Sequence, residues 1–203
     1  MKHIASLSFL IFMSCQSPPI SIHQTQSLMY QNRETPPNEI QSVQTGLDVL
    51  LDSLSEELKG KSIALVTNHT GIDKKGIPNY KRLMALDGID LNVIFSPEHG
   101  LFGEAAAGEK VNYDGKEIPL PEVISLYGKN RKPSPDMLEE IDLILYDIQD
   151  IGARFYTYIT TLGLVMESAG ELDIPIWILD RPNPIRGDKI EGPILDMNFQ
   201  TFV

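Results

Sequence analysis

The sequence lacks the features that disulfide-stabilised, nucleic-acid-binding and dinucleotide-binding proteins require. With one cysteine, Cys15, in 203 residues, the chain cannot form an intramolecular disulfide, so packing must hold its fold. Its 17 Lys and Arg residues are outnumbered by 28 Asp and Glu residues and form no basic stripe, which argues against nucleic acid as a partner. No G-x-G-x-x-G pattern follows the first predicted strand, so we expect no dinucleotide, and predict no cofactor.

The amino terminus has the pattern of an export signal. Residues 4–15 form a short apolar segment after Lys2, which fits the central region of a secretory signal and is too short to span a bilayer. Residues 12–15 resemble a bacterial lipobox, although Phe12 stands where leucine is usual. We predict a signal peptide over 1–15, lipidation of Cys15, and an exported protein anchored at the cell envelope, facing the periplasm or on the cell surface. A plain cleaved signal and an uncleaved membrane anchor stay open.

Residues 16–44 are rich in Gln, Ser, Pro, Asn and Thr and cannot bury much apolar surface, which predicts a flexible linker. The chain as a whole is 42% hydrophobic, enough for one substantial core. We therefore place one folded domain at residues 45–203.

Within this domain, apolar spacing predicts alternating helices and strands. Helices are expected over 46–58, 78–86 and 134–140, with a longer one ending near Ser168. Four apolar strands are expected over 62–67, 91–95, 141–146 and 174–179. Residues 103–132 are expected to be irregular, with a hairpin turn at Asp114-Gly115, and to form a wall or lid over the site. The alternation predicts an α/β, Rossmann-like three-layer domain with a mostly parallel sheet.

Each predicted strand ends in polar residues. Because parallel strands bring their carboxyl ends to one edge of the sheet, where ligands bind in such folds, we expect these side chains to converge on a site. They are Asn68, His69, Glu98, His99, Asp147, Gln149, Asp150, Arg181 and Asn183.

One chemistry that these residues fit is acid–base catalysis on a sugar. Glu98 would be the acid, and the second group would be Asp147, Asp150 or a tyrosine. Arg154 and Arg181 would hold an anionic substituent of the substrate, or would pair with nearby aspartates.

The tyrosine is chosen by helical spacing. On a helix, Phe155 and Tyr158 would share the core-facing side, and Tyr156 would point toward the cleft.

A metal-dependent hydrolase is the alternative chemistry. His69, Glu98, His99 and Asp147 are suitable ligand types for a divalent cation. No H-E-x-x-H spacing accompanies them, so we assign no metal ligand.

Four segments in order, residues 66–71, 96–103, 146–158 and 180–184, resemble the exo-β-N-acetylmuramidase family of the NamZ type, in its amino-terminal domain. The resemblance covers roughly residues 45–203. It implies a bacterial glycoside hydrolase that releases N-acetylmuramic acid from the non-reducing end of peptidoglycan fragments in cell-wall turnover or recycling. It places the family's catalytic glutamate on Glu98 and a site tyrosine on Tyr156. The lactyl carboxylate of this sugar would pair with an arginine at this edge of the sheet.

The resemblance also implies a smaller carboxyl-terminal domain that closes the cleft in family members, and we predict that residues 45–203 correspond to the catalytic domain without it. The resemblance therefore leaves the activity of this chain by itself open. A non-catalytic, lipid-anchored sugar-binding module is the non-enzymatic alternative.

Overall fold

The computed structural model describes residues 43–104 and 119–201. The predicted signal peptide, Cys15, nearly all of the predicted linker and the Asp114-Gly115 turn lie outside these residues. The described chain forms a five-stranded sheet in which every pairing is parallel, in the order β3-β2-β1-β4-β5. The strands are β1 (Ser62–Thr67), β2 (Asp90–Ser96), β3 (Glu122–Ser125), β4 (Leu143–Asp147) and β5 (Ile176–Ile178).

The described helices lie before β1, between β1 and β2, between β3 and β4, and between β4 and β5, as the spacing predicted, with one further 3₁₀ turn after β5. The expected helix over 46–58 is one helical stretch of changing pitch, and the long helix begins at Tyr158. The elements are α2 (Gly46–Val49), the π-helical η1 (Leu50–Leu54), the 3₁₀ turn η2 (Ser55–Leu58), α3 (Asn79–Met84), α4 (Pro135–Leu138), α5 (Tyr158–Glu171) and the 3₁₀ turn η3 (Met197–Phe199).

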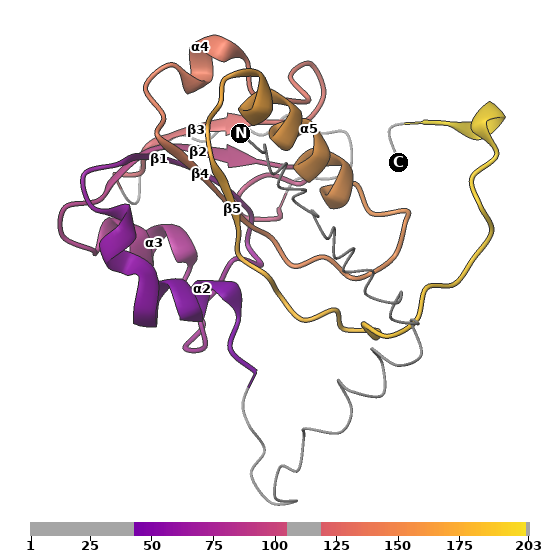
Figure 1. The fold of residues 1–203 in the computed structure, drawn as a ribbon, viewed down its shortest axis with the longest axis horizontal. Coiled ribbons are helices and arrows are strands. Elements are labelled where there is room, and N and C mark those ends of the chain that lie inside the picture. Colours follow the sequence, from indigo (N-terminus) through magenta and orange to yellow (C-terminus); the bar gives the residue numbers. More distant parts are fainter. Residues whose placement is uncertain (1–42, 105–118, 202–203) are drawn as a thin grey trace, which may run out of the picture. The chain divides into compact units, whose positions relative to one another are not determined.

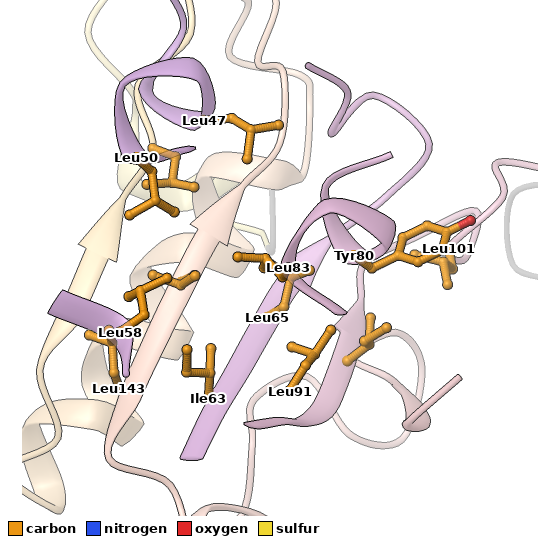
Figure 2. Close-up of a cluster of buried hydrophobic side chains, with 13 residues drawn as sticks. Leu47, Leu50, Leu58, Ile63, Leu65, Tyr80, Leu83, Leu91, Leu101 and Leu143 are labelled. Carbon is orange, nitrogen blue, oxygen red and sulfur yellow. The ribbon is translucent and has the colours of Figure 1, made fainter. Parts of the chain in front are cut away.

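Helices cover both faces of the sheet, with α2 and α3 on one side and α4 and α5 on the other (Figure 1). Successive strand side chains point to opposite faces, so β1 sends Ile63 and Leu65 into one core and Ala64 and Val66 into another. The first core also contains Leu47, Leu50 and Leu83 (Figure 2). This confirms the three-layer α/β architecture.

The prediction of four strands was wrong by one. β3 lies in the stretch expected to be irregular and pairs with β2 at the edge of the sheet. Its four residues are partly or well exposed and carry no buried apolar run, which is the signal that identified the other strands.

The placement of Phe155 on the core side of a helix was also wrong. α5 starts three residues later, and the Phe155 side chain is 72% exposed. Tyr158, the first residue of the helix, is buried as expected. Among the described residues, no helix combines the length and apolar character needed to cross a bilayer.

The first helix is tied to the end of the last strand. Gly46 N–H donates to the Asp180 carbonyl at 2.6 Å, and a Cβ at Gly46 would lie 2.4 Å from Asp180 N. Thr45 and Asp48 form a reciprocal capping box at the start of α2. Glycine is therefore required at the first residue of α2.

Candidate active site

A cavity of about 470 Å³ opens at the carboxyl ends of the central strands. Its walls come from the segments that follow β1, β2 and β4, on both sides of the point where the strand order reverses. The lining residues are His69, Thr70, Glu98, His99, Gln149, Ile151, Phe155, Tyr156, Thr157 and Tyr158.

A tight turn presents Glu98 to this cavity. The turn follows β2 directly, and Gly100 N–H donates to the Pro97 carbonyl at 3.1 Å. His99 and Gly100 both have left-handed backbones, with φ of 71° and 73°. A left-handed conformation is uncommon for a residue with a side chain, and such strain concentrates at functional sites. The turn thus sets Glu98 and His99 side by side in the cavity wall.

Two hydroxyl groups interact with the Glu98 carboxyl. Thr157 Oγ1 donates to Glu98 Oε2 at 3.2 Å, from the residue just before α5. The interaction of the Tyr127 hydroxyl with the Glu98 carboxyl raises the pKa of Tyr127 above its usual value. Burial raises the pKa of Tyr158, with a small further contribution from Glu98 and an opposing one from the Asn68 amide. Both tyrosines are therefore protonated hydrogen-bond donors at neutral pH.

Three aromatic rings form one side of the cavity. The Tyr156 and Tyr158 rings meet edge to face with centroids 5.8 Å apart, and the Phe155 ring lies 5.6 Å from that of Tyr156. Tyr158 is buried beneath, whereas Phe155 projects into solvent. This wall offers apolar ring faces beside polar hydroxyls, a surface suited to the alternating apolar and hydroxylated faces of a sugar.

Asp147 and Arg181 do not line the cavity but form a buried pair behind it. Arg181 Nε and Nη2 donate to the two Asp147 carboxylate oxygens at 2.6 and 3.0 Å. Asn79 Nδ2 donates to the same carboxylate at 2.8 Å, and Arg181 Nη2 also donates to the Ile72 carbonyl. With these partners, the pair ties the ends of β4 and β5 to the segment after β1.

Asn68 and Gln149 also hold loops together. The Asn68 side-chain oxygen accepts from the Thr70 N–H and hydroxyl, and the Thr70 hydroxyl accepts from Gln149 N–H at 2.9 Å. Gln149 Nε2 donates to the carbonyls of Asp150 and Pro182. This chain of bonds fixes the spacing between the loops that carry His69 and Ile151.

The remaining predicted residues lie just outside the cavity. Asp150 Oδ1 accepts from Gly152 N–H at 2.6 Å, and Asn183 Oδ1 accepts from Ile185 N–H. Arg154 is exposed, and its Nη1 donates to the Pro193 carbonyl at 2.6 Å. In the part of the chain that the structure describes, no three His, Cys, Asp or Glu side chains gather to hold a metal ion. The four ligands of the metal alternative therefore form no such group.

The sequence as a whole matches one known family. The family model described as "Exo-beta-N-acetylmuramidase NamZ, N-terminal" covers residues 63–203. The chain belongs to this family. Over 162 residues it is 47% identical to the peptidoglycan beta-N-acetylmuramidase NamZ of Bacillus subtilis (strain 168), a match that covers 79% of this chain and 39% of that protein.

Two crystal structures of DUF1343 family proteins from Bacteroides fragilis NCTC 9343 have the same architecture as this NamZ-family chain. One superposes with a TM-score of 0.69 at 43% identity, over 79% of this chain and 40% of the other. The second has a TM-score of 0.63 at 35% identity, over 80% and 41%. The chain thus spans about two fifths of the length of these relatives.

Of the residues predicted for the site of this NamZ-family domain, the structure brings five into the cavity wall: His69, Glu98, His99, Gln149 and Tyr156. Six others do not line it: Asn68, Asp147, Asp150, Arg154, Arg181 and Asn183. Their roles toward a substrate stay predictions.

Sequence reasoning missed Thr157 and Tyr127, the two hydroxyls on Glu98. Thr157 stood inside a family motif without a spacing signal, and Tyr127 stood in the stretch expected to be irregular. Only the sheet order, which places β3 beside β2, brings Tyr127 near Glu98.

Proposed function

We propose that this chain forms the catalytic domain of an exo-β-N-acetylmuramidase, a glycoside hydrolase that releases N-acetylmuramic acid from the non-reducing end of peptidoglycan fragments in cell-wall recycling. The observation that carries the proposal is the position of Glu98. It is a carboxyl group on a strained turn, in the wall of a cavity, bonded to hydroxyls and flanked by aromatic rings. The 47% identity to a protein named as a peptidoglycan beta-N-acetylmuramidase supports the choice of sugar.

Glu98 would act as the acid. A protonated Glu98 gives its proton to the glycosidic oxygen while the bond from that oxygen to the anomeric carbon breaks. The electron pair of the broken bond goes to the leaving oxygen, and water adds to the sugar. Glu98 is the one carboxylate among the described residues that line the cavity. Asp147 is a poor second group because Arg181 and Asn79 already occupy its carboxylate.

The second group is therefore better sought among the other cavity residues. Tyr156 is the candidate we favour, because its ring lies in the wall beside the aromatic neighbours that would position a sugar. His69 and His99 also line the cavity, and imidazole is a common proton-transfer group in enzymes.

The lactyl carboxylate of N-acetylmuramic acid calls for a cation. Arg181 directs both its Nε and Nη2 at a buried carboxylate, so we assign this role to Arg154, which is exposed at the edge of the site. Its Nη1 is held by the Pro193 carbonyl, which leaves the rest of the guanidinium to face a ligand.

The test is release of N-acetylmuramic acid from a chromogenic β-muramide. We would assay the full chain, and the same chain extended through any downstream coding sequence, each with and without chelator. We expect chelator-insensitive release that is lost in Glu98→Gln and kept in Glu104→Gln, a matched change at an exposed position nearby. Chelator-sensitive release would instead support the metal-dependent alternative. Sugar binding without release, unchanged in Glu98→Gln, would support the sugar-binding module.

We also propose that the protein is exported and anchored to the cell envelope by a lipid on Cys15. The support is the apolar segment that precedes this residue and its lipobox-like ending. Cells that express the protein should incorporate a fatty-acid analogue into it, and Cys15→Ala should abolish the label. Equal labelling of both would refute the anchor.

A further inference from the structure

Thr157, the residue before α5, does not form the side-chain cap that a threonine at this position usually forms. Thr157 occupies the N-cap position, where threonine normally accepts a hydrogen bond from a backbone N–H of the first turn. It makes no such bond, and its φ and ψ of −81° and −12° are helical rather than extended. Its hydroxyl instead donates to Glu98 Oε2 at 3.2 Å. The first turn of α5 therefore has no side-chain cap from Thr157, and the Thr157 hydroxyl binds the candidate acid instead.

The Thr157 hydroxyl is one of two that reach Glu98 from separate parts of the fold. Thr157 comes from the start of α5, and Tyr127 comes from the segment after β3. Glu98 itself lies on the turn after β2, in which His99 is strained. Tyr158 also interacts with Glu98, and His99 is the neighbour of Glu98 in the turn. The carboxyl therefore interacts with hydroxyl groups from two separate parts of the fold.

We propose that Thr157 is a positioning residue that keeps the Glu98 carboxyl turned into the cavity before and after proton transfer. A hydroxyl can accept a hydrogen bond from a protonated carboxyl and donate one to a carboxylate. When Glu98 has given its proton to the leaving oxygen, rotation of the Thr157 hydroxyl restores a hydrogen bond to the new carboxylate. The proton that the attacking water releases can then return to Glu98 without movement of the side chain. The catalytic meaning of this role rests on the proposed function.

The first test separates turnover from binding. In Thr157→Val, which keeps the shape and removes the hydroxyl, we expect kcat to fall about 10- to 100-fold with KM nearly unchanged, because displacing a catalytic group by about 1 Å has a cost of this order. Thr157→Ser, which keeps the hydroxyl, should restore most of the rate. The matched control is Thr161→Val, which removes a hydroxyl one turn along α5 that donates to the Thr157 carbonyl. Equal rates in Thr157→Val and wild type, or equal losses in Thr157→Val and Thr161→Val, would overturn the proposal.

The second test does not depend on activity. Crystal structures of Thr157→Val and Thr157→Ser should show the Glu98 side chain in a new rotamer in the first and unmoved in the second. An unmoved Glu98 in Thr157→Val would overturn the proposal even if turnover fell. If no Glu98-dependent release is seen in wild type, the proposed function fails, and these two structures still decide whether Thr157 holds Glu98. Thr157→Ala serves the same comparison if the valine variant does not fold.

Discussion

Asp147 and Arg181 form a two-bond ion pair whose side chains are 0% and 6% exposed, at the edge of the sheet where the site lies. The pair joins the last residue of β4 to the segment that follows β5, and through Ile72 to the loop after β1. It is therefore a structural support of the cavity, at positions where the sequence suggested groups that contact a ligand.

Removing the arginine of this pair should destabilise the domain strongly. Arg181→Ala leaves the buried Asp147 carboxylate without its cation, which typically costs about 3–5 kcal/mol. Arg186 also pairs with an aspartate, Asp188, through two hydrogen bonds, but both side chains lie mostly in solvent. Arg186→Ala should change the free energy of unfolding far less, because a solvent-exposed ion pair contributes little. Urea unfolding of the two variants measures the difference, and similar losses would contradict this account.

The capping box at the start of α2 should make stability depend on pH in the acid range. Burial acts to raise the pKa of Asp48, but hydrogen bonds from the N–H groups of Lys74 and Thr45 and from the Thr45 hydroxyl outweigh it and lower the pKa below 3.8. A lowered pKa stabilises the folded state above the unfolded-state value, and this contribution disappears as pH falls through the folded-state value.

We therefore expect Asp48→Asn to be less stable than wild type by about 0.5–2 kcal/mol at pH 7, with the gap narrowing below about pH 4. Thermal unfolding across pH 2.5–7 measures this gap. A difference that stays constant to the lowest pH would show that the charge of Asp48 does not contribute.

Gly103 should be needed to keep His69 in the cavity wall. Its φ is 73°, and a Cβ there would lie 2.3 Å from His69 Nδ1. Gly128 has a similar φ of 83°, but a Cβ there would meet nothing within 4 Å. Both Gly→Ala changes should carry a backbone cost of about 1–2 kcal/mol, whereas only Gly103→Ala should displace the His69 ring. Proton NMR of the histidine ring is the measurement, and unchanged His69 signals in Gly103→Ala would contradict the close contact.

Phe155 should contribute to sugar affinity and little to stability. Its side chain is 72% exposed and lies in the aromatic wall of the cavity. Phe155→Ala should raise the KM for a muramide, or the Kd for free N-acetylmuramic acid, by about 3- to 10-fold, a loss of the size expected for one aromatic contact. The melting temperature should barely change. Phe199→Ala, at a residue 74% exposed and outside the cavity wall, is the control and should leave both constants unchanged.

The parts of the fold that sequence reasoning found are those with a strong apolar period. β1 and β4 are buried along nearly their whole length, so their runs of Ile, Leu, Val and Ala were easy to identify. β3 escaped because an exposed edge strand of four residues has no such run. The exposure of Phe155 escaped because α5 begins at Tyr158, and a helical period was applied to residues that precede the helix.

The sequence was enough to predict where the site lies, but not to separate the residues that face a ligand from those that hold the structure together. Parallel topology alone predicts that residues after β1, β2 and β4 meet, and Glu98, His69 and Gln149 do line one cavity. Which polar residues face a ligand and which face each other depends on side-chain distances. Asp147 and Arg181 are close enough to satisfy one another, and no spacing rule distinguishes such a pair from two separate ligand contacts.

The central position of β1 bears on how the domain assembles during synthesis. β1 is the first of the five strands to be synthesised, and β2 and β3, which lie on one side of it, are synthesised before β4 and β5. The other side of β1 stays open until β4 is made. The bond from Gly46 to Asp180 then joins the earliest helix to some of the last residues of the sheet region. This hydrogen bond can therefore form only after all five strands have been synthesised.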